Sequence, residues 1–235
     1  MPKFNLSIII PVFNESHNIQ KLTYKIKKQL NSINFELIFV DDNSTDGSKT
    51  ILKKLKKNFK FFKPIFRFKK RDLTQSCFDG IKKSKFKNIL IMDGDLQHDP
   101  KNIPKMIKIY KENPVDLVVG ARPLIKGPNS GLSEIRRLAS KILIYFFSIF
   151  KINTADPMSG YFLFNKNIYT KNKKFFFGKG FKILADFLIN SKNELKTRDC
   201  VIKFNRRYND KSKMNLRILL ILIQFYLLSL IKNKK

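Results

Sequence analysis

Short apolar runs alternate along this chain with longer segments in which apolar residues recur every three or four positions. The short runs have the length of buried strands, and the longer segments have the periodicity of amphipathic helices. We expect strands over five runs, Leu6–Val12, Glu36–Val40, Pro64–Phe68, Asn88–Met92 and Asp116–Gly120. Helices are expected between them, over Ser16–Leu30, Asp46–Leu55, Gln75–Lys83 and Pro100–Tyr110. This alternation predicts an α/β domain with a mostly parallel sheet, flanked by helices on both faces.

Carboxylates gather where two of these strands end. Asp41 and Asp42 follow the second strand, and Asp93 and Asp95 follow the fourth. Ligands of open α/β sheets bind at the carboxyl ends of the strands. Both groups are therefore candidates for ligand binding.

The step Asp93-Gly94-Asp95 has the chemistry of a metal site. Mg²⁺ and Mn²⁺ prefer hard oxygen ligands and keep positions for water and substrate phosphates. The two carboxylates supply such ligands, Gly94 leaves room for a ligand to approach, and Gln97 can add a neutral oxygen. A polar turn after a strand is the alternative. His98, close to this step, is expected to be a solvated loop residue.

The segment Pro11–Glu15 follows the first strand. Phe13 can stack on a flat base, and Glu15 can accept a hydrogen bond from a ribose or a base. Asp42 can bind the same groups or merely terminate its strand. The alternative for the segment is a strand–helix turn with Asn14 or Ser16 as the helix N-cap, and for this motif alone that alternative is favoured.

The composition is strongly basic. The chain has 48 Lys and Arg against 18 Asp and Glu, a formal net charge of +30. Because most of the basic residues are lysines, we interpret the excess mainly as compositional drift over solvated faces, although it would also suit an anionic lipid surface. The stretch Lys57–Lys70 mixes lysine with aromatic residues, but no nucleic-acid-binding module is recognisable, so we expect no nucleic-acid partner.

The two cysteines, Cys77 and Cys200, have no metal or disulfide spacing, which suits a reducing compartment. No secretory signal is visible at the N-terminus.

Arginine is scarce, so its positions are informative. An arginine offers a planar fork that binds phosphate and that lysine cannot supply. Arg122 follows the fifth strand, and Arg136 and Arg207 lie in later segments. The alternative is surface ion pairing, for which few carboxylates are present.

Two later segments are strongly apolar, Leu138–Phe150 and Ile218–Ile231. As a helix the second would be about 21 Å long, short of the ~30 Å hydrocarbon core of a bilayer. The two segments are either buried core helices or helices that lie at a membrane interface with basic flanks. The pattern alone leaves both interpretations open.

Taken in order, the motifs resemble those of family 2 glycosyltransferases of the GT-A fold, and within that family those of dolichol-phosphate mannose synthases and related polyprenyl-phosphate sugar transferases. The similarity covers roughly residues 5–215. The matching segments are Ile8–Glu15, Val40–Gly47, Met92–Pro100, Val119–Arg122, Asp156–Tyr161 and Phe204–Lys213.

The resemblance implies a role for each matching residue. The nucleoside would be held by Pro11, Phe13, Glu15, Val40, Asp42 and Gly94. A divalent cation, Mg²⁺ or Mn²⁺, would be bound by Asp93, Asp95 and Gln97. The acceptor phosphate would be bound by Arg122, Arg136, Ser140, Arg207, Ser212 and Lys213. The catalytic group would be Asp93, Asp95, Arg122 and Arg207.

The implied reaction is an inverting, metal-dependent transfer of a hexose from a nucleotide sugar, GDP-mannose, to a polyprenyl phosphate. A phosphate monoester has a second pKa of about 6 and is largely dianionic at pH 7, so it is already a nucleophile and needs no catalytic base. We expect a catalytic domain over residues 1–213, with an interface helix over 138–151. Residues 214–235 would form an apolar C-terminal helix that associates with the cytoplasmic face of the membrane. Whether a membrane-bound partner subunit exists is left open.

Several alternatives remain. Another family 2 enzyme would use UDP-glucose or UDP-N-acetylglucosamine, or a glycan acceptor in cell-envelope biosynthesis, and a glycan acceptor would need a base such as Asp186. A phosphohydrolase with Asp93 as nucleophile is a different class.

Three residues depart from the family pattern. Asp72 and Asp210 stand where glycine is usual, and both loops are expected to need unusual backbone angles that suit aspartate poorly. Gly94 in place of the usual alanine is expected to be a mild change.

Overall fold

The computed structural model describes residues 4–122, 150, 152–180, 182–203, 224–226 and 228–229. Several predicted site residues lie outside the described residues, namely Arg136, Ser140, Arg207, Ser212 and Lys213. The same is true of Asp210, of the segment 138–149 and of most of 214–235.

Strands and helices alternate through the first half of the chain. In order they are β1 (Asn5–Val12), α1 (Ser16–Gln29), β2 (Asn34–Asp41), α2 (Ser48–Asn58), β3 (Phe62–Phe66), α3 (Leu73–Lys83) and β4 (Asn88–Ile91). A short 3₁₀ turn, η1 (Pro100–Asn102), then leads into α4 (Ile103–Glu112) and β5 (Leu117–Ala121). The later elements are β6 (Phe162–Asn165), α6 (Lys166–Asn172), α7 (Ile183–Asn190) and β7 (Thr197–Val201).

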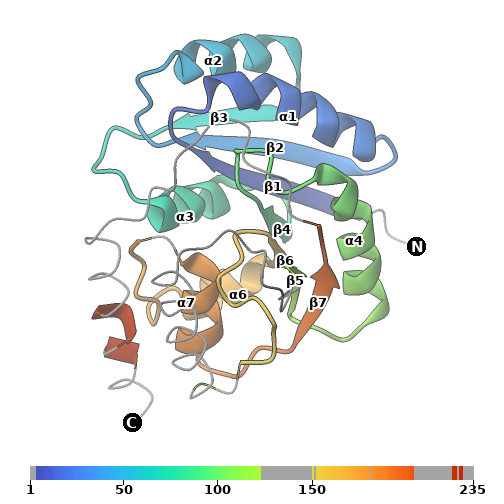
Figure 1. Ribbon diagram of the computed structural model, residues 1–235, viewed down its shortest axis with the longest axis vertical. Coiled ribbons are helices and arrows are strands. Elements are labelled where there is room, and N and C mark those ends of the chain that lie inside the picture. The colour runs from blue at the N-terminus through green and yellow to red at the C-terminus, as the bar shows by residue number, and fades with distance from the viewer. Residues whose placement is uncertain are drawn as a thin grey trace, which may run out of the picture.

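The strands form a seven-stranded sheet in the order β3-β2-β1-β4-β6-β5-β7 (Figure 1). Strand β6 runs antiparallel to both of its neighbours, β4 and β5, and the other pairs are parallel. The mostly parallel α/β fold predicted from the sequence is therefore confirmed.

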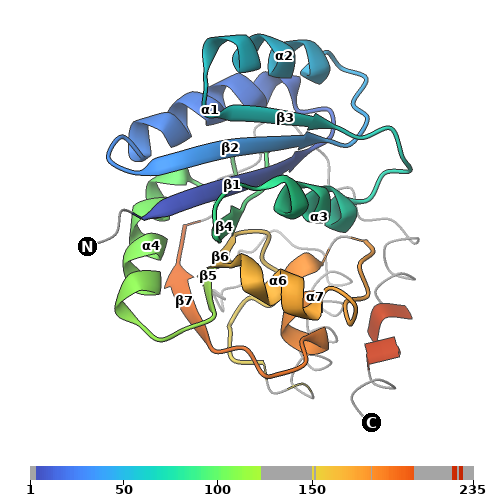
Figure 2. The ribbon, with the colours of Figure 1, turned by 180° about the vertical axis from the view of Figure 1, so that it is seen from behind.

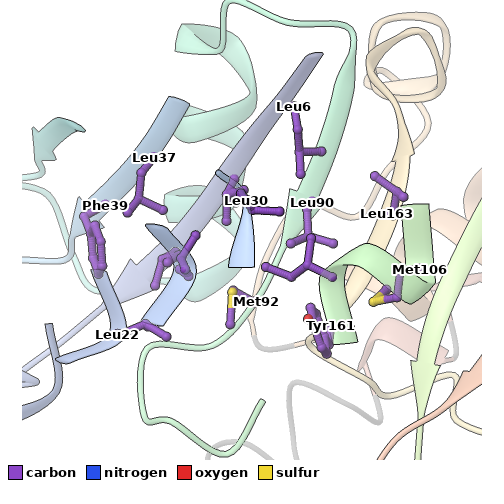
Figure 3. Packing of buried hydrophobic residues seen from close by; sticks show 14 of the residues in the cluster. Leu6, Leu22, Leu30, Leu37, Phe39, Leu90, Met92, Met106, Tyr161 and Leu163 are labelled. Carbon is purple, nitrogen blue, oxygen red and sulfur yellow. The ribbon is translucent and has the colours of Figure 1, made fainter. Parts of the chain in front are cut away.

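Helices cover both faces of the sheet, as Figures 1 and 2 show from opposite sides. On one face Leu6, Ile8 and Ile10 of β1 belong to one buried cluster with residues of α1, α2 and α4. Figure 3 shows part of this cluster, with Leu6 of β1, Leu22 of α1 and Met106 of α4 labelled. On the other face α3, α6 and α7 pack in the cluster that includes Ile9. Because its side chains are buried on both faces, β1 is a continuous apolar run and not an alternating one.

Strand β3 begins two residues before the predicted run and contains Pro64. Proline cannot donate a ladder hydrogen bond, so it is tolerated in this strand because β3 lies at the edge of the sheet and pairs only with β2.

The described residues of the C-terminal segment pack against the domain. Phe225 is buried in a cluster with Ala185 and Ile189 of α7, and the Asn190 side-chain amide donates to the Ser229 hydroxyl at 3.3 Å. A C-terminal helix over 214–235 lies largely outside the described residues, so it stays a prediction. Among the helices that are described, none combines the length and the apolar character needed to cross a bilayer.

Candidate active site

Strand β6, which is antiparallel to its neighbours, brings three separate segments together at the carboxyl ends of the parallel strands. Strands β4 and β5 end at this edge, and β6 starts there because it runs the opposite way between them. Asp93 follows β4, Arg122 follows β5, and the segment Asp156–Tyr161 leads into β6. The predicted metal and phosphate residues therefore meet with a segment that the sequence places far along the chain.

Asp93, Asp95 and Gln97 share an environment. All three are half-buried, whereas Gly94, Leu96 and His98 between and after them are buried. The Asp95 carboxylate accepts a hydrogen bond from the Gln97 backbone N–H at 3.1 Å. Leu96 has a φ of +64°, a left-handed conformation that is costly for leucine and that tightens this loop.

His98 is a buried residue, so the prediction of a solvated loop histidine is wrong. Its side chain is 1% exposed and stacks on Tyr161 with ring centroids 4.9 Å apart. Its Nδ1 accepts the Asp93 backbone N–H at 3.1 Å. Burial lowers the pKa of His98, which favours the neutral ring that this acceptor role requires. His98 thus anchors the start of the candidate metal loop.

The missing side chain of Gly160 leaves room for the Asp93 carboxylate. A Cβ atom at Gly160 would lie 2.7 Å from Oδ2 and 2.8 Å from Oδ1 of Asp93, closer than real Cβ contacts come. The carboxylate therefore rests against the backbone of the segment that leads into β6. Gly160 belongs to one of the matching motifs, but nothing in the sequence indicated this contact.

The position of Gly94 leaves no room for a side chain, because β1 lies against it. A Cβ atom there would lie 2.7 Å from Cγ1 of the buried Val12. An alanine here would force Val12 or the loop to move. That glycine in place of the usual alanine is a mild change stays a prediction.

Arg122 is fixed by a two-point ion pair. Its Nε donates to Oδ2 of Asp156 at 2.6 Å and its Nη2 to Oδ1 at 2.9 Å. The hydrogen bonds from Arg122 to Asp156 raise the pKa of Arg122 further. Asp156 is buried, whereas the Arg122 side chain stays 45% exposed. The pairing orients the guanidinium without removing it from solvent.

Lys182, directly before α7, is influenced by the charges of Arg122, Asp93 and Asp156 and was missed from the sequence. Burial lowers the pKa of this half-buried lysine, the nearby Arg122 adds to that effect, and Asp93 and Asp156 oppose it. The chain has 39 lysines, and no sequence pattern around Lys182 distinguishes it from the others.

The predicted nucleoside residues lie at the ends of β1 and β2. Pro11 and Val40 are register partners and both are buried. Phe13 is half-buried, and the Arg71 guanidinium lies 4.4 Å from the centroid of its ring. The Glu15 carboxylate accepts from the Asn18 side-chain amide at 2.7 Å. The role of these residues in binding a nucleoside stays a prediction.

Asp42 sits inside a hydrogen-bonded network. It forms a buried ion pair with Arg67 and accepts the Asp72 backbone N–H at 2.8 Å. Burial raises the pKa of Asp42, and the Arg67 charge opposes this rise. The neighbouring Asp41 is fully buried, and its Oδ1 has no hydrogen-bond partner among the described residues.

The segment is a strand–helix turn between β1 and α1, but neither Asn14 nor Ser16 is the N-cap of α1, so that part of the alternative is wrong. The N-cap is Glu15, which makes no side-chain capping bond. The Ser16 N–H is instead bonded to Asp46 at 2.9 Å, and the Glu15 N–H to the Ser48 hydroxyl at 3.2 Å. Side chains from the loop after β2 and from the first residue of α2 thus accept the backbone N–H groups at the start of α1, which have no partner within the helix.

Asp72 adopts ordinary extended angles, φ −158° and ψ 116°, so the expected backbone strain is absent at this position. Its side chain caps α3 by accepting the Gln75 N–H at 3.0 Å, and it also accepts the Gly180 N–H at 2.9 Å. In this chain the aspartate fits its loop and joins it to a distant segment.

Asp186 has a structural environment. It is buried and accepts the backbone N–H groups of Phe177 at 2.9 Å and Gly178 at 2.7 Å. A carboxylate held in this way stabilises a turn, and it is poorly placed to act as the loose base considered from the sequence.

The donor set fits a divalent cation that shares its coordination with a substrate. Asp93, Asp95 and Gln97 offer two carboxylates and one amide, and no group of three or more His, Cys, Asp or Glu is found within the described part of the chain. A protein set this small leaves positions for phosphate oxygens and water, as Mg²⁺ and Mn²⁺ sites commonly do.

A family model, Glycosyl transferase family 2, matches residues 7–173. The chain belongs to this family.

Within the family, it is similar to dolichol-phosphate mannosyltransferases. The protein from Pyrococcus furiosus is 32% identical over 212 residues, which cover 89% of this chain and 59% of that protein. The protein from Saccharomyces cerevisiae is 31% identical over 186 residues, 77% of this chain and 69% of that protein. The chain thus spans less than two thirds of the length of the Pyrococcus relative.

Solved structures share the fold. Glucosyl-3-phosphoglycerate synthase from Mycobacterium tuberculosis, in complex with phosphoglyceric acid, superposes with a TM-score of 0.73 at 14% identity and covers 97% of this chain and 79% of that one. The same enzyme with Mn²⁺, uridine diphosphate and phosphoglyceric acid gives a TM-score of 0.72 at 15% identity, covering 97% and 78%. These neighbours confirm the predicted GT-A fold.

Proposed function

We propose that this protein transfers a hexose, mannose from GDP-mannose, with inversion to a polyprenyl or dolichyl phosphate. The observation that carries the proposal is the meeting of the Asp93–Asp95 loop with the oriented Arg122 guanidinium at one edge of the sheet. The relatives named dolichol-phosphate mannosyltransferases support the sugar and the acceptor.

The donor would bind across the edge formed by β2, β1 and β4. Phe13 offers an aromatic face for the base, and Asp93 and Asp95 lie toward the side of β5, where the diphosphate would lie. Asp93, Asp95 and Gln97 would hold a divalent cation, which supplies positive charge against the diphosphate as it leaves. The neighbour solved with Mn²⁺ and uridine diphosphate supports a divalent cation in this fold.

The carboxylates around the transfer site favour an acceptor that needs no base. Asp156 is paired with Arg122, and Asp186 accepts two backbone N–H groups. A sugar hydroxyl would require a carboxylate to take its proton, whereas a phosphate dianion attacks without one. Catalysis would then consist of holding two anionic groups in line and neutralising the leaving diphosphate, which Arg122 is oriented to do.

A lipid acceptor would bring the protein to a membrane surface, and we propose the cytoplasmic face. The net charge of +30 supports attraction to anionic lipid headgroups. Leu228, 40% exposed in the C-terminal segment, supports an apolar contact at the same surface.

The test is a transfer assay with purified protein, a polyprenyl phosphate and GDP-mannose, UDP-glucose or UDP-N-acetylglucosamine, each with Mg²⁺ or Mn²⁺ and then with EDTA. We expect an EDTA-sensitive glycolipid from GDP-mannose only. A product from a uridine donor would correct the sugar, and donor consumption without a lipid product would overturn the acceptor.

Asp95→Asn provides the matched variant. It keeps the size of the side chain and removes one charge from the cation site, so we expect turnover to fall by about 100-fold or more while the unfolding midpoint stays unchanged. Lys179→Gln, an exposed change in a neighbouring loop, is the control and should keep full activity. Full activity of Asp95→Asn would remove the proposed cation site.

A further inference from the structure

The loop between β3 and α3 carries four consecutive exposed residues, Phe68, Lys69, Lys70 and Arg71. Phe68 is 80% exposed, the largest fraction of any large hydrophobic side chain in the described part of the chain. The three residues after it are basic, and no described carboxylate forms an ion pair with them. The Lys49 ammonium lies 5.6 Å from the centroid of the Phe68 ring. A single exposed apolar side chain is common, but an aromatic ring among several cations suits an anionic surface with an apolar layer beneath it.

The two ends of this loop are held at one carboxylate. Arg67 forms its buried ion pair with one oxygen of Asp42, and the Asp72 backbone N–H donates to the other oxygen at 2.8 Å. The Arg67 guanidinium also donates to the Asp72 carbonyl at 3.2 Å. At the far end of the loop, the Arg71 guanidinium lies over the ring of Phe13. The exposed residues therefore project from a fixed base, so less conformational freedom is lost when a surface binds them.

The loop leaves the sheet at the edge that carries the candidate cation site. Strands β3, β2, β1 and β4 are neighbours in this order and run parallel, so the loops after β3 and β4 emerge at the same edge. Three strand spacings of about 4.8 Å put these two loops roughly 14 Å apart where they leave the sheet. A surface that binds the loop is therefore within reach of the Asp93–Asp95 loop.

Figures 1 and 2 both show the loop between β3 and α3 on the same side of the molecule as the described C-terminal residues. These residues include Leu228, which is 40% exposed. Two exposed apolar side chains from distant parts of the sequence are thus available to one flat partner.

We propose that residues 68–71 dock the protein on an anionic lipid surface, with Phe68 in the headgroup region and the three basic side chains against lipid phosphates. Aromatic side chains are favoured at the membrane interface, and each lysine or arginine held near an anionic leaflet strengthens binding by about five-fold. The inference rests on the proposed function, which brings the protein to a membrane, and deepens it by naming the loop that makes the contact.

A tryptophan at position 68 reports the contact directly, because the chain contains no tryptophan. The emission of Phe68→Trp is recorded with vesicles of phosphatidylcholine alone and with vesicles of equal parts phosphatidylcholine and phosphatidylglycerol. We expect a blue shift with the anionic vesicles, and quenching when their lipids are brominated. Tyr24→Trp, at a 48% exposed position of α1, is the matched reporter and should show neither change.

Co-sedimentation with the same anionic vesicles measures the contribution of each side chain. We expect Phe68→Ala to bind about ten-fold more weakly, and Lys69→Gln combined with Lys70→Gln about 20-fold more weakly. Lys56→Gln combined with Lys57→Gln removes the same charge at the end of α2, at the opposite edge of the sheet, and should bind like wild-type protein. All these positions are exposed, so the urea unfolding midpoints should not change.

Three results would overturn the inference. One is an unchanged emission of Phe68→Trp with vesicles that sediment the protein, and another is an equal loss of binding for the two lysine pairs, which would indicate only the general charge. The third is a blue shift with a short RNA but not with vesicles, which would replace the lipid by a nucleic acid. Failure of the proposed function is seen separately, as wild-type protein that binds vesicles through this loop but forms no glycolipid.

Discussion

The Asp93 carboxylate and Gly160 touch although 66 residues lie between them in the chain. The contact depends on the missing side chain of Gly160. We predict that Gly160→Ala displaces the Asp93 carboxylate and weakens Mn²⁺ binding by about ten-fold, the value of one well-placed ligand contact. Calorimetric titration with Mn²⁺ in the presence of GDP measures this.

Gly80→Ala is the control for that substitution. A Cβ atom at Gly80 would lie 2.5 Å from Cγ2 of Ile9, in the packing of α3 on β1. The control should lower the free energy of unfolding and leave Mn²⁺ affinity alone. Equal Mn²⁺ binding by Gly160→Ala and wild-type protein would show that Asp93 does not contact the cation.

Asp156 orients Arg122, and its own substitution tests that orientation. We predict that Asp156→Asn lowers kcat by about 10- to 100-fold, because a neutral amide holds the guanidinium at one point instead of two, while KM for the donor changes little. Steady-state kinetics separate the two parameters. Asp199→Asn is the control, since Asp199 anchors Ala155 of the same segment at 2.8 Å without touching an arginine. A similar fall in kcat for both variants would mean that the anchoring of the segment matters and the arginine does not.

At the residue level the sequence predicted which side chains end the strands, but not their surroundings. Asp93, Asp95 and Arg122 stand at the predicted edge because strand ends follow from apolar runs. The burial of His98 depends on Tyr161, which belongs to a later strand, so no local pattern could reveal it. The same reason hides Lys182, which is influenced by charges that follow β4 and β5.

At the level of elements, Asp72 joins α3 to the loop 177–180. We predict that Asp72→Gly lowers the free energy of unfolding by about 1–2 kcal/mol, from the lost bond to the Gly180 N–H, the weaker helix cap and the flexibility of glycine. Urea denaturation measures the change. Asp72→Asn should lose less, because its amide oxygen can still cap α3. A stability of Asp72→Gly equal to that of wild-type protein would contradict this role of Asp72.

Asp46 connects the starts of two helices, and its protonation provides a pH test. Burial raises the pKa of Asp46, but hydrogen bonds from Ser48 and Ser16 outweigh that effect and lower the pKa from 3.8 to about 2. Because the folded-state pKa is depressed, the stabilisation is present above the unfolded pKa and is lost as the pH falls through the folded one.

We therefore predict that Asp46→Asn is less stable than wild-type protein at pH 7, by at most about 1 kcal/mol because this carboxylate is exposed and screened. The difference should shrink as the pH falls from about 4 to about 2. Urea midpoints of the two proteins along this pH series check the sign, and a difference that is constant with pH would contradict it.

The elements that we predicted from the sequence belong to the first half of the chain, where strands and helices alternate regularly. Strands β1 to β5 and their helices came from period and length alone. We had no expectation from the sequence for β6, α6, α7 or β7. Strand β7 is an edge strand with the polar sequence Thr197–Val201, and β6 is only four residues long. Both strands pair with strands that are distant in the sequence, so a local sequence pattern cannot identify β6 or β7.

At the scale of the whole molecule, the C-terminal segment has one residue turned into the domain and another exposed. Phe225 is 6% exposed and Leu228 is 40% exposed. We predict that Phe225→Ala lowers the free energy of unfolding by about 3 kcal/mol, because it leaves a cavity against α7. Leu228→Gln should instead weaken binding to anionic phospholipid vesicles by a few-fold without changing stability.

Vesicle co-sedimentation and urea denaturation on both variants make the comparison. Vesicle binding that Leu228→Gln leaves unchanged would rule out this residue as a membrane contact. The sequence left open whether the segment is buried or lies on a membrane, because period and charge are alike in the two cases. The buried side of Phe225 answers that question for one residue.

The ion pair between Arg122 and Asp156 also joins the two ends of the segment 123–155. The entropy of bringing the two ends of that segment together is therefore lost once, at the ion pair, whatever residues lie between them. Descendants of this protein could exchange the intervening sequence, and with it the choice of acceptor, while the sheet register and the cation loop stay as they are. In such a lineage the chemistry would be inherited and the selectivity would be free to diverge.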